Sequence, residues 1–95
     1  MQNARTVLIT GASSGIGAAF ARALAARQYD LVLVARREDR LISLARELEQ
    51  RFPIQAEVLV ADLANPSGME QVEKRLAISE TLAILVNNAG FGIPG

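Results

Sequence analysis

The sequence predicts an α/β fold built on a doubly wound parallel sheet, in the order βαβαβαβ over residues 1–95. Short apolar runs alternate with longer segments in which apolar residues recur every three or four positions, the pattern of strands joined by helices. The apolar runs lack the polar alternation of a half-solvated sheet, and a parallel sheet covered on both faces tolerates such runs. Ligands of these sheets bind at the carboxyl ends of the strands.

Four apolar runs are predicted to be the strands, and they cover residues 6–10, 31–35, 57–61 and 82–86. They are rich in Val, Ile and Leu, which fit a pleated and buried surface. The last run would leave a bare strand edge in the isolated chain. A bare strand edge invites association, so we expect the isolated chain to be marginally stable, aggregating or dimeric.

The first helix is predicted for about residues 16–28, a segment that contains six alanines. Alanine favours the helix and lets the helix axis come close to the sheet. Phe20 and Leu24 lie one turn apart within this segment. We therefore expect this helix to pack tightly on the sheet after the first strand.

The second helix is predicted for about residues 38–52, and the third opens at Asn65 and Pro66. An apolar stripe marks the second helix: Leu41, Leu44, Leu48 and Phe52. Glu47 and Arg51 are spaced as a supportive i,i+4 ion pair on its solvent side. Asn65 fits the N-cap of the third helix and Pro66 its first turn, where the missing N–H costs nothing.

The composition excludes several classes of chemistry. Ten basic and ten acidic residues give a net charge of zero, so no overall field favours nucleic acid or an anionic membrane. Because the chain contains no cysteine and no histidine, we predict no disulfide, no metal site of the usual ligand type and no histidine acid-base catalysis. The apolar runs are strand-sized and the first residues lack a signal-peptide layout. We expect a soluble, cytoplasmic protein.

Three glycines, Gly11, Gly15 and Gly17, follow the first predicted strand at the start of the first helix. A helix start exposes unpaired N–H groups with partial positive charge, which bind anions. We expect Gly11 to supply the turn, Gly15 to allow close approach of a diphosphate, and Gly17 to pack helix against strand. Ser13 and Ser14 add hydroxyls that can donate to phosphate oxygens. The alternative is a tight loop with no ligand.

The stretch TGASSGIG, residues 10–17, resembles the glycine motif of the short-chain dehydrogenases/reductases. NNAG, residues 87–90, is similar to the second signature of that family, and the Asp-Leu pair at 62–63 resembles a further family position. All three stretches occur in the family's order, each at the end of a predicted strand. The resemblance implies a Rossmann-like sheet that holds a nicotinamide dinucleotide. Taken alone, NNAG would be a polar turn that ends a strand.

The resemblance also implies where the dinucleotide lies. Its diphosphate would lie over the helix start: Gly15, Ile16 and Gly17. Its adenosine ribose would lie near the end of the fourth strand: Asn88, Ala89 and Gly90. Its adenine would be flanked by Asp62 and the backbone of Leu63. Asn87 would have a structural role, tying neighbouring strands together.

The end of the second strand predicts which dinucleotide is preferred. An NAD site usually has an acid there to accept from the ribose 2′-OH, but this strand runs into Arg36 and Arg37. Asp30 precedes the strand, and Glu38 and Asp39 fall in the first turn of the next helix. Two guanidinium groups suit a 2′-phosphate. We therefore predict NADP(H) as the cofactor, preferred over NAD, with Arg36 closer to the strand end than Arg37.

A second interpretation of these arginines remains open. Residues 36–40 form a charge run that could simply be the solvated opening of the second helix. The two interpretations differ in what they expect of the cofactor. Only the first makes the ratio of NADP to NAD affinity depend on Arg36.

The family's reaction uses a tyrosine with a lysine four residues later, and the chain does not contain this pair. Tyr29 is the single tyrosine and Lys74 the single lysine. We interpret Tyr29 as a packing residue and Lys74 as a solvated helix residue, and we assign no catalytic residue. The chain is therefore expected to be a single N-terminal NADP-binding segment, 1–95, truncated before the catalytic half and inactive alone.

The sequence is compatible with three functions. The first is an NADP(H)-dependent short-chain oxidoreductase that transfers hydride between nicotinamide and an alcohol or carbonyl, here as its cofactor-binding fragment. We expect the full-length protein to be a homo-oligomer. The second is a non-catalytic dinucleotide-binding or sensing module. The third is a structural domain that has kept the fold without the ligand.

Overall fold

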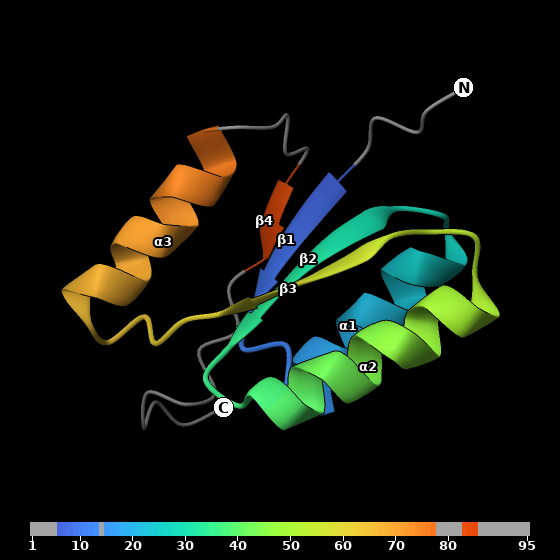
Figure 1. Ribbon diagram of the computed structural model, residues 1–95. Helices are drawn as coiled ribbons and strands as arrows, with labels where there is room; N and C mark the ends of the chain where they lie inside the picture. The colour runs from blue at the N-terminus through green and yellow to red at the C-terminus, as the bar shows by residue number, and fades with distance from the viewer. Residues whose placement is uncertain (1–5, 14, 78–82, 86–95) are drawn as a thin grey trace.

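The computed structural model describes residues 6–13, 15–77 and 83–85, and strands and helices alternate along them (Figure 1). In chain order the elements are β1 (Thr6–Thr10), α1 (Gly15–Ala26), β2 (Asp30–Ala35), α2 (Glu38–Arg51), β3 (Ala56–Val60), α3 (Pro66–Ala77) and β4 (Ala83–Leu85). The predicted order βαβαβαβ is confirmed. Most predicted bounds agree with the structure within one residue.

The strands form a parallel sheet in the order β3-β2-β1-β4. The chain steps outward from β1 to β2 to β3 and then crosses back to place β4 on the other side of β1. Helices α1 and α2 cover one face of this sheet and α3 covers the opposite face (Figure 1). The carboxyl ends of neighbouring strands lie level with one another, with Ala35 paired with Val60. This is the expected doubly wound α/β architecture.

Alternate residues of the central strands belong to two separate cores. Val7 and Ile9 of β1 pack in the cluster under α1 and α2, whereas Leu8 packs with Val32 and with Val72 of α3. Leu8 and Ile9 are both fully buried even though they point to opposite faces. A strand buried on both faces reads as a continuous apolar run, which is why the sequence lacks the alternation of a half-solvated sheet.

Helix α1 packs on the sheet through small residues, as expected from its composition. Its buried residues are Gly17, Ala21 and Ala25, which recur every four positions and form one narrow face. Phe20 lies on another side of the helix and is 51% exposed. The helix ends at Ala26, two residues before the predicted end, because Gln28 takes a left-handed conformation with φ of 68°.

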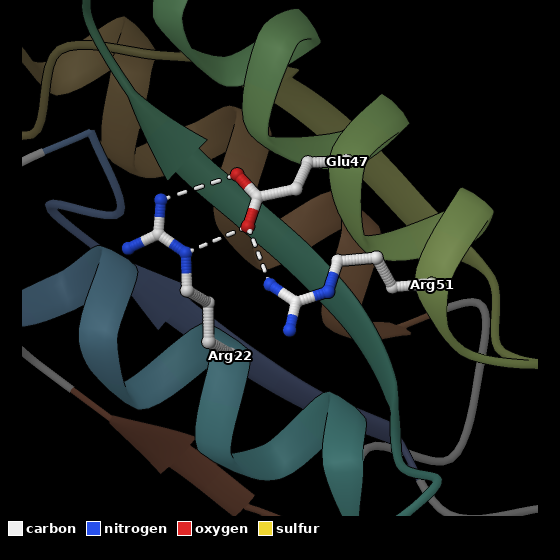
Figure 2. A network of polar contacts seen from close by, with 3 residues as sticks. All are labelled: Arg22, Glu47 and Arg51. Atoms are coloured by element: carbon white, nitrogen blue, oxygen red, sulfur yellow. Dashed lines mark hydrogen bonds and ion pairs between the residues drawn. The ribbon is translucent and has the colours of Figure 1, made fainter.

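An ion-pair network joins α1 to α2 (Figure 2). Arg22 on α1 donates from Nε and Nη2 to the two carboxylate oxygens of Glu47 on α2, at 2.8 and 3.2 Å. Arg51 donates to the same carboxylate at 3.4 Å, which confirms the expected i,i+4 pair. The hydrogen bonds from Arg22 are the main reason that the pKa of Glu47 lies below its ordinary value. The network ties together the two helices that cover one face of the sheet.

Candidate functional site

The turn between β1 and α1 depends on two of the three motif glycines. Gly11 has a positive φ of 66°, a conformation that favours glycine, so it supplies the turn as predicted. A Cβ atom on Gly17 would overlap the carbonyl oxygen of Gly11 and lie 3.0 Å from the Cα of Ala12. The backbone N–H of Ala12 donates to the carbonyl of Val34 at 3.1 Å, which fixes the turn to β2. Gly17 therefore allows a close contact, as expected, but its partner is the turn after β1.

The third glycine, Gly15, has open space where its side chain would be. No described atom lies within 4 Å of a Cβ built on it, apart from its chain neighbours. It is the first residue of α1, whose first turn contains no acidic residue. Ile16 beside it is 57% exposed, and Ser13 is half-buried. An exposed helix start with open space and no negative charge suits an anionic group.

A hollow of about 240 Å³ lies beyond the carboxyl ends of β2 and β3. Its lining comes from three segments: Arg36 after β2, residues 60–62 at the end of β3, and the start of α3 with Asn65, Ser67, Gly68 and Gln71. The hollow therefore brings together Arg36 and Asp62, two predicted site residues that are far apart in the sequence.

The start of α3 forms one wall of this hollow. The Asn65 side-chain oxygen accepts from the backbone N–H of Ser67 at 3.2 Å and from its hydroxyl at 3.0 Å, which confirms the predicted N-cap. Asp62 Oδ1 accepts from the backbone N–H of Ala64 at 3.0 Å and so shapes the loop before the helix. A Cβ on Gly68 would overlap the carbonyl oxygen of Asp62. The close approach at Gly68 places the first turn of α3 directly against the backbone of Asp62, two residues after β3.

The two arginines after β2 have different positions. Arg36 lines the hollow, whereas Arg37 is the N-cap residue of α2 and its carbonyl accepts from the N–H of Leu41 at 3.2 Å. Both side chains are exposed, and within residues 6–13, 15–77 and 83–85 neither guanidinium has a hydrogen-bond or ion-pair partner. The whole run 36–40 is exposed, so exposure alone does not separate the two interpretations of these charges.

The acidic residues near β2 lie where the sequence predicts them. Asp30 begins β2 at its amino end, where its Oδ1 accepts from the N–H of Gln55 at 2.9 Å. Glu38 and Asp39 occupy the first turn of α2. No acidic residue among the described ones therefore follows β2 directly at its carboxyl end. This arrangement lacks the acid that would accept from a ribose 2′-OH.

The remaining predicted residues either pack elsewhere in the fold, lie exposed on it, or lie outside the part of the chain that the structure describes. Leu63 is half-buried and packs in the core cluster under α3. Tyr29 packs against the core under α1 and α2, and Lys74 is exposed, as expected of both. The following lie outside the described residues: Ser14, Asn87, Asn88, Ala89 and Gly90.

Gly68 and Gln71 both line the hollow, although neither was predicted from the sequence to be a site residue. A glycine in the first turn of a predicted helix was a usable signal for Gly68, because glycine disfavours helices and needs a packing reason there. Nothing in the local sequence distinguishes Gln71 from a solvated helix residue. Only the tertiary structure shows that Gln71, one turn after Ser67, lines the hollow.

The described part of the chain contains no cluster of three or more His, Cys, Asp or Glu residues that could hold a metal ion. Among these same residues, no helix has the length and apolar character to cross a membrane.

Comparison with known proteins decides the family. The model of the short chain dehydrogenase family matches residues 5–95. The chain belongs to this family. A very-long-chain 3-oxoacyl-CoA reductase of Candida glabrata is 41% identical to this short-chain dehydrogenase chain over 85 residues, which are 87% of the chain and 24% of that reductase.

Solved structures of the family agree with the fold. A short-chain dehydrogenase from Sphingobium yanoikuyae in complex with NADPH is 51% identical, with a TM-score of 0.82 over 90% of this chain and 34% of that protein. A bulky-bulky ketone specific alcohol dehydrogenase from Comamonas testosteroni is 44% identical, with a TM-score of 0.86 over 99% of this chain and 38% of that protein. This short-chain dehydrogenase chain thus spans about a quarter to two fifths of the length of these relatives.

Proposed function

We propose that this chain forms the cofactor-binding part of an NADP(H)-dependent short-chain oxidoreductase. The complete protein would transfer hydride between the nicotinamide and a small-molecule alcohol or carbonyl substrate. Family membership and the NADPH bound by the Sphingobium relative support this proposal. The observation that carries it is the cation Arg36 beside the hollow, where β2 ends without an acid.

The described residues fit an anionic dinucleotide. Gly15 offers open space at an acid-free helix start, and Gly17 keeps that start close to the turn after β1. We assign the diphosphate to the glycine turn: Gly11, Ser13, Ser14, Gly15, Ile16 and Gly17. We assign the adenine to the hollow beside Asp62 and Leu63, and the ribose to Asn88, Ala89 and Gly90. Bound NADPH would supply the hydride and bound NADP+ would accept it, while this chain would bind and orient the cofactor.

The preference for NADP over NAD is assigned to Arg36. A guanidinium without a described partner can donate two hydrogen bonds to a phosphate without breaking an existing ion pair. Hydrogen bonds to charged groups contribute about 1.5–3 kcal/mol each, so one good contact favours NADP by about tenfold to a hundredfold. Arg37 is the second candidate, and its role as N-cap residue of α2 places its backbone in the helix start.

Calorimetric titration with both cofactors tests this assignment. We expect Arg36→Ala to lower the ratio of NADP to NAD affinity by about tenfold or more. Arg40→Ala is the matched control, because Arg40 is an exposed arginine of the same charge run that does not line the hollow. Equal ratios in wild type, Arg36→Ala and Arg40→Ala would favour the solvated charge run and contradict the proposal.

The remaining features of the complete protein stay predictions. We propose that the acid-base residues of the reaction lie outside this chain, since the only tyrosine and the only lysine, Tyr29 and Lys74, are not spaced as the family's catalytic pair. Turnover assays on the 95-residue chain are expected to show cofactor binding without reaction. Cytoplasmic location and a homo-oligomeric state are testable by cell fractionation and by light scattering.

A further inference from the structure

The hollow beside Arg36 contains polar side chains that differ in what they can still bind. Asn65 already accepts two hydrogen bonds through its side-chain oxygen, and the hydroxyl of Ser67 donates one of them. Asp62 accepts through Oδ1 from the backbone of Ala64. The side chains of Asn65, Ser67 and Asp62 thus already use some of their hydrogen-bonding atoms within the loop and the start of α3.

Gln71 differs from these residues. It lines the hollow one turn after Ser67, is exposed, and has no hydrogen-bond partner within the described residues. Its amide offers both a donor and an acceptor, whereas the guanidinium of Arg36 can only donate and the carboxylate of Asp62 can only accept. Gln71 is therefore the side chain of this wall with a complete donor–acceptor pair available to a ligand.

Adenine matches that pair. Its N6 amino group donates and its N7 accepts, and a glutamine amide can bind both atoms at once. The N6 amino group has two hydrogens, so Asp62 can accept one while the Gln71 oxygen accepts the other. Hypoxanthine and guanine instead have two acceptors at this edge, O6 and N7, which suit an arginine.

We propose that Gln71 is a specificity-determining residue that recognises the N6 and N7 edge of the adenine in the hollow and discriminates against 6-oxo purines. The inference rests on the proposed function, because it takes the hollow as the adenine site. It concerns the base, whereas Arg36 concerns the 2′-phosphate.

The test compares adenosine 2′,5′-bisphosphate with inosine 2′,5′-bisphosphate, which share both phosphates and differ in the base. Binding of each to the chain is measured by calorimetry. We expect wild type to prefer the adenosine compound and Gln71→Ala to reduce that preference by about fivefold to tenfold, the lower part of the range for a bidentate contact. Gln71→Arg is expected to shift the preference towards the inosine compound, because arginine donates to O6 and N7.

Gln50→Ala is the matched control, because Gln50 is an exposed glutamine on α2 that does not line the hollow. Circular dichroism establishes that each variant is folded. A lower preference in Gln71→Ala or a reversed one in Gln71→Arg supports the assignment. Wild-type preference in both variants overturns it while NADPH binding, and with it the proposed function, stands. If wild type binds neither bisphosphate and does not bind NADPH, both the Gln71 assignment and the proposed function are overturned.

Discussion

Two glycines of one motif, two residues apart, are expected to fail in opposite ways when replaced by alanine. The Gly17 Cβ would overlap the carbonyl oxygen of Gly11 and approach Ala12 Cα at 3.0 Å. Apart from its chain neighbours and the backbone of its own helix, the Gly15 Cβ would meet no described atom within 4 Å. Gly17→Ala should therefore destabilise the fold. Gly15→Ala should leave the fold intact and weaken cofactor binding.

The magnitude for Gly17→Ala follows from the atoms it would meet. Both are backbone atoms, and the turn that contains them is fixed to β2 by the hydrogen bond from Ala12 to Val34 at 3.1 Å. Overpacking of this kind costs about 1–3 kcal/mol, and the better helix propensity of alanine recovers up to about 1 kcal/mol. Because the clashing atoms are backbone atoms that cannot turn aside, we take the upper part of that cost, about 2–3 kcal/mol. The net loss is then about 1–2 kcal/mol, which corresponds to a Tm lower by about 4 °C or more for a domain of this size.

The magnitude for Gly15→Ala comes from the ligand. Replacing glycine with alanine in a compatible backbone changes stability by less than about 1 kcal/mol, in the stabilising direction. The added methyl group would occupy the open space that we assign to the diphosphate. Loss of one charge-assisted hydrogen bond there, about 1.5–3 kcal/mol, weakens NADP binding by about tenfold or more.

Thermal melting by circular dichroism and calorimetric titration with NADP measure the two effects in the same samples. If Gly17→Ala has the same melting temperature as wild type, the close contact at Gly17 does not exist. If Gly15→Ala has the same NADP affinity as wild type, the diphosphate lies elsewhere. Either result would refute the role given to that glycine.

Two further predictions concern stability. Gly68→Ala forces a Cβ onto the carbonyl of Asp62, so we expect a loss of about 1–3 kcal/mol in urea denaturation, and a wild-type midpoint would contradict the packing at the start of α3. Glu47→Gln removes the carboxylate that Arg22 binds at 2.8 Å, and because both side chains are partly exposed we expect a loss of no more than about 1 kcal/mol at pH 7. The folded-state pKa of Glu47 is lowered, mainly by Arg22. The stability difference between wild type and Glu47→Gln is therefore fully present above the unfolded-state pKa of about 4.3 and disappears as the pH falls through the folded-state pKa. A difference in unfolding free energy between the two proteins that stays constant as the pH falls well below the unfolded value would exclude the ion pair as its cause.

Much of the fold could be predicted because it depends on local patterns. The stripe on α2 and the cap at Asn65 involve residues within one or two turns of each other, and both agree with the structure. Phe20 shows the limit of this reasoning. Its spacing from Leu24 is that of an apolar face, yet it is 51% exposed because the small residues of α1 face the sheet.

The candidate site was predictable only in part, because only some of its residues lie close together in the sequence. The glycine turn lies within one stretch of sequence, so its geometry could be expected before the structure was known. The hollow joins Arg36 to Asp62 and to Gln71, which belong to different elements. Which of these side chains share a space depends on how β2, β3 and α3 are arranged.

The sequence by itself determined the order of strands and helices, the turn of left-handed backbone at Gly11, and the absence of an acid directly after β2. These features follow from backbone preferences and side-chain periodicity over a few residues. Only the tertiary structure decided that Gly68 must lack a side chain and that Gln71 lies on the same hollow as Arg36. Those contacts arise where parallel strands end level with one another and a crossover helix packs across them, so they depend on strand order and register, which no short stretch of sequence contains.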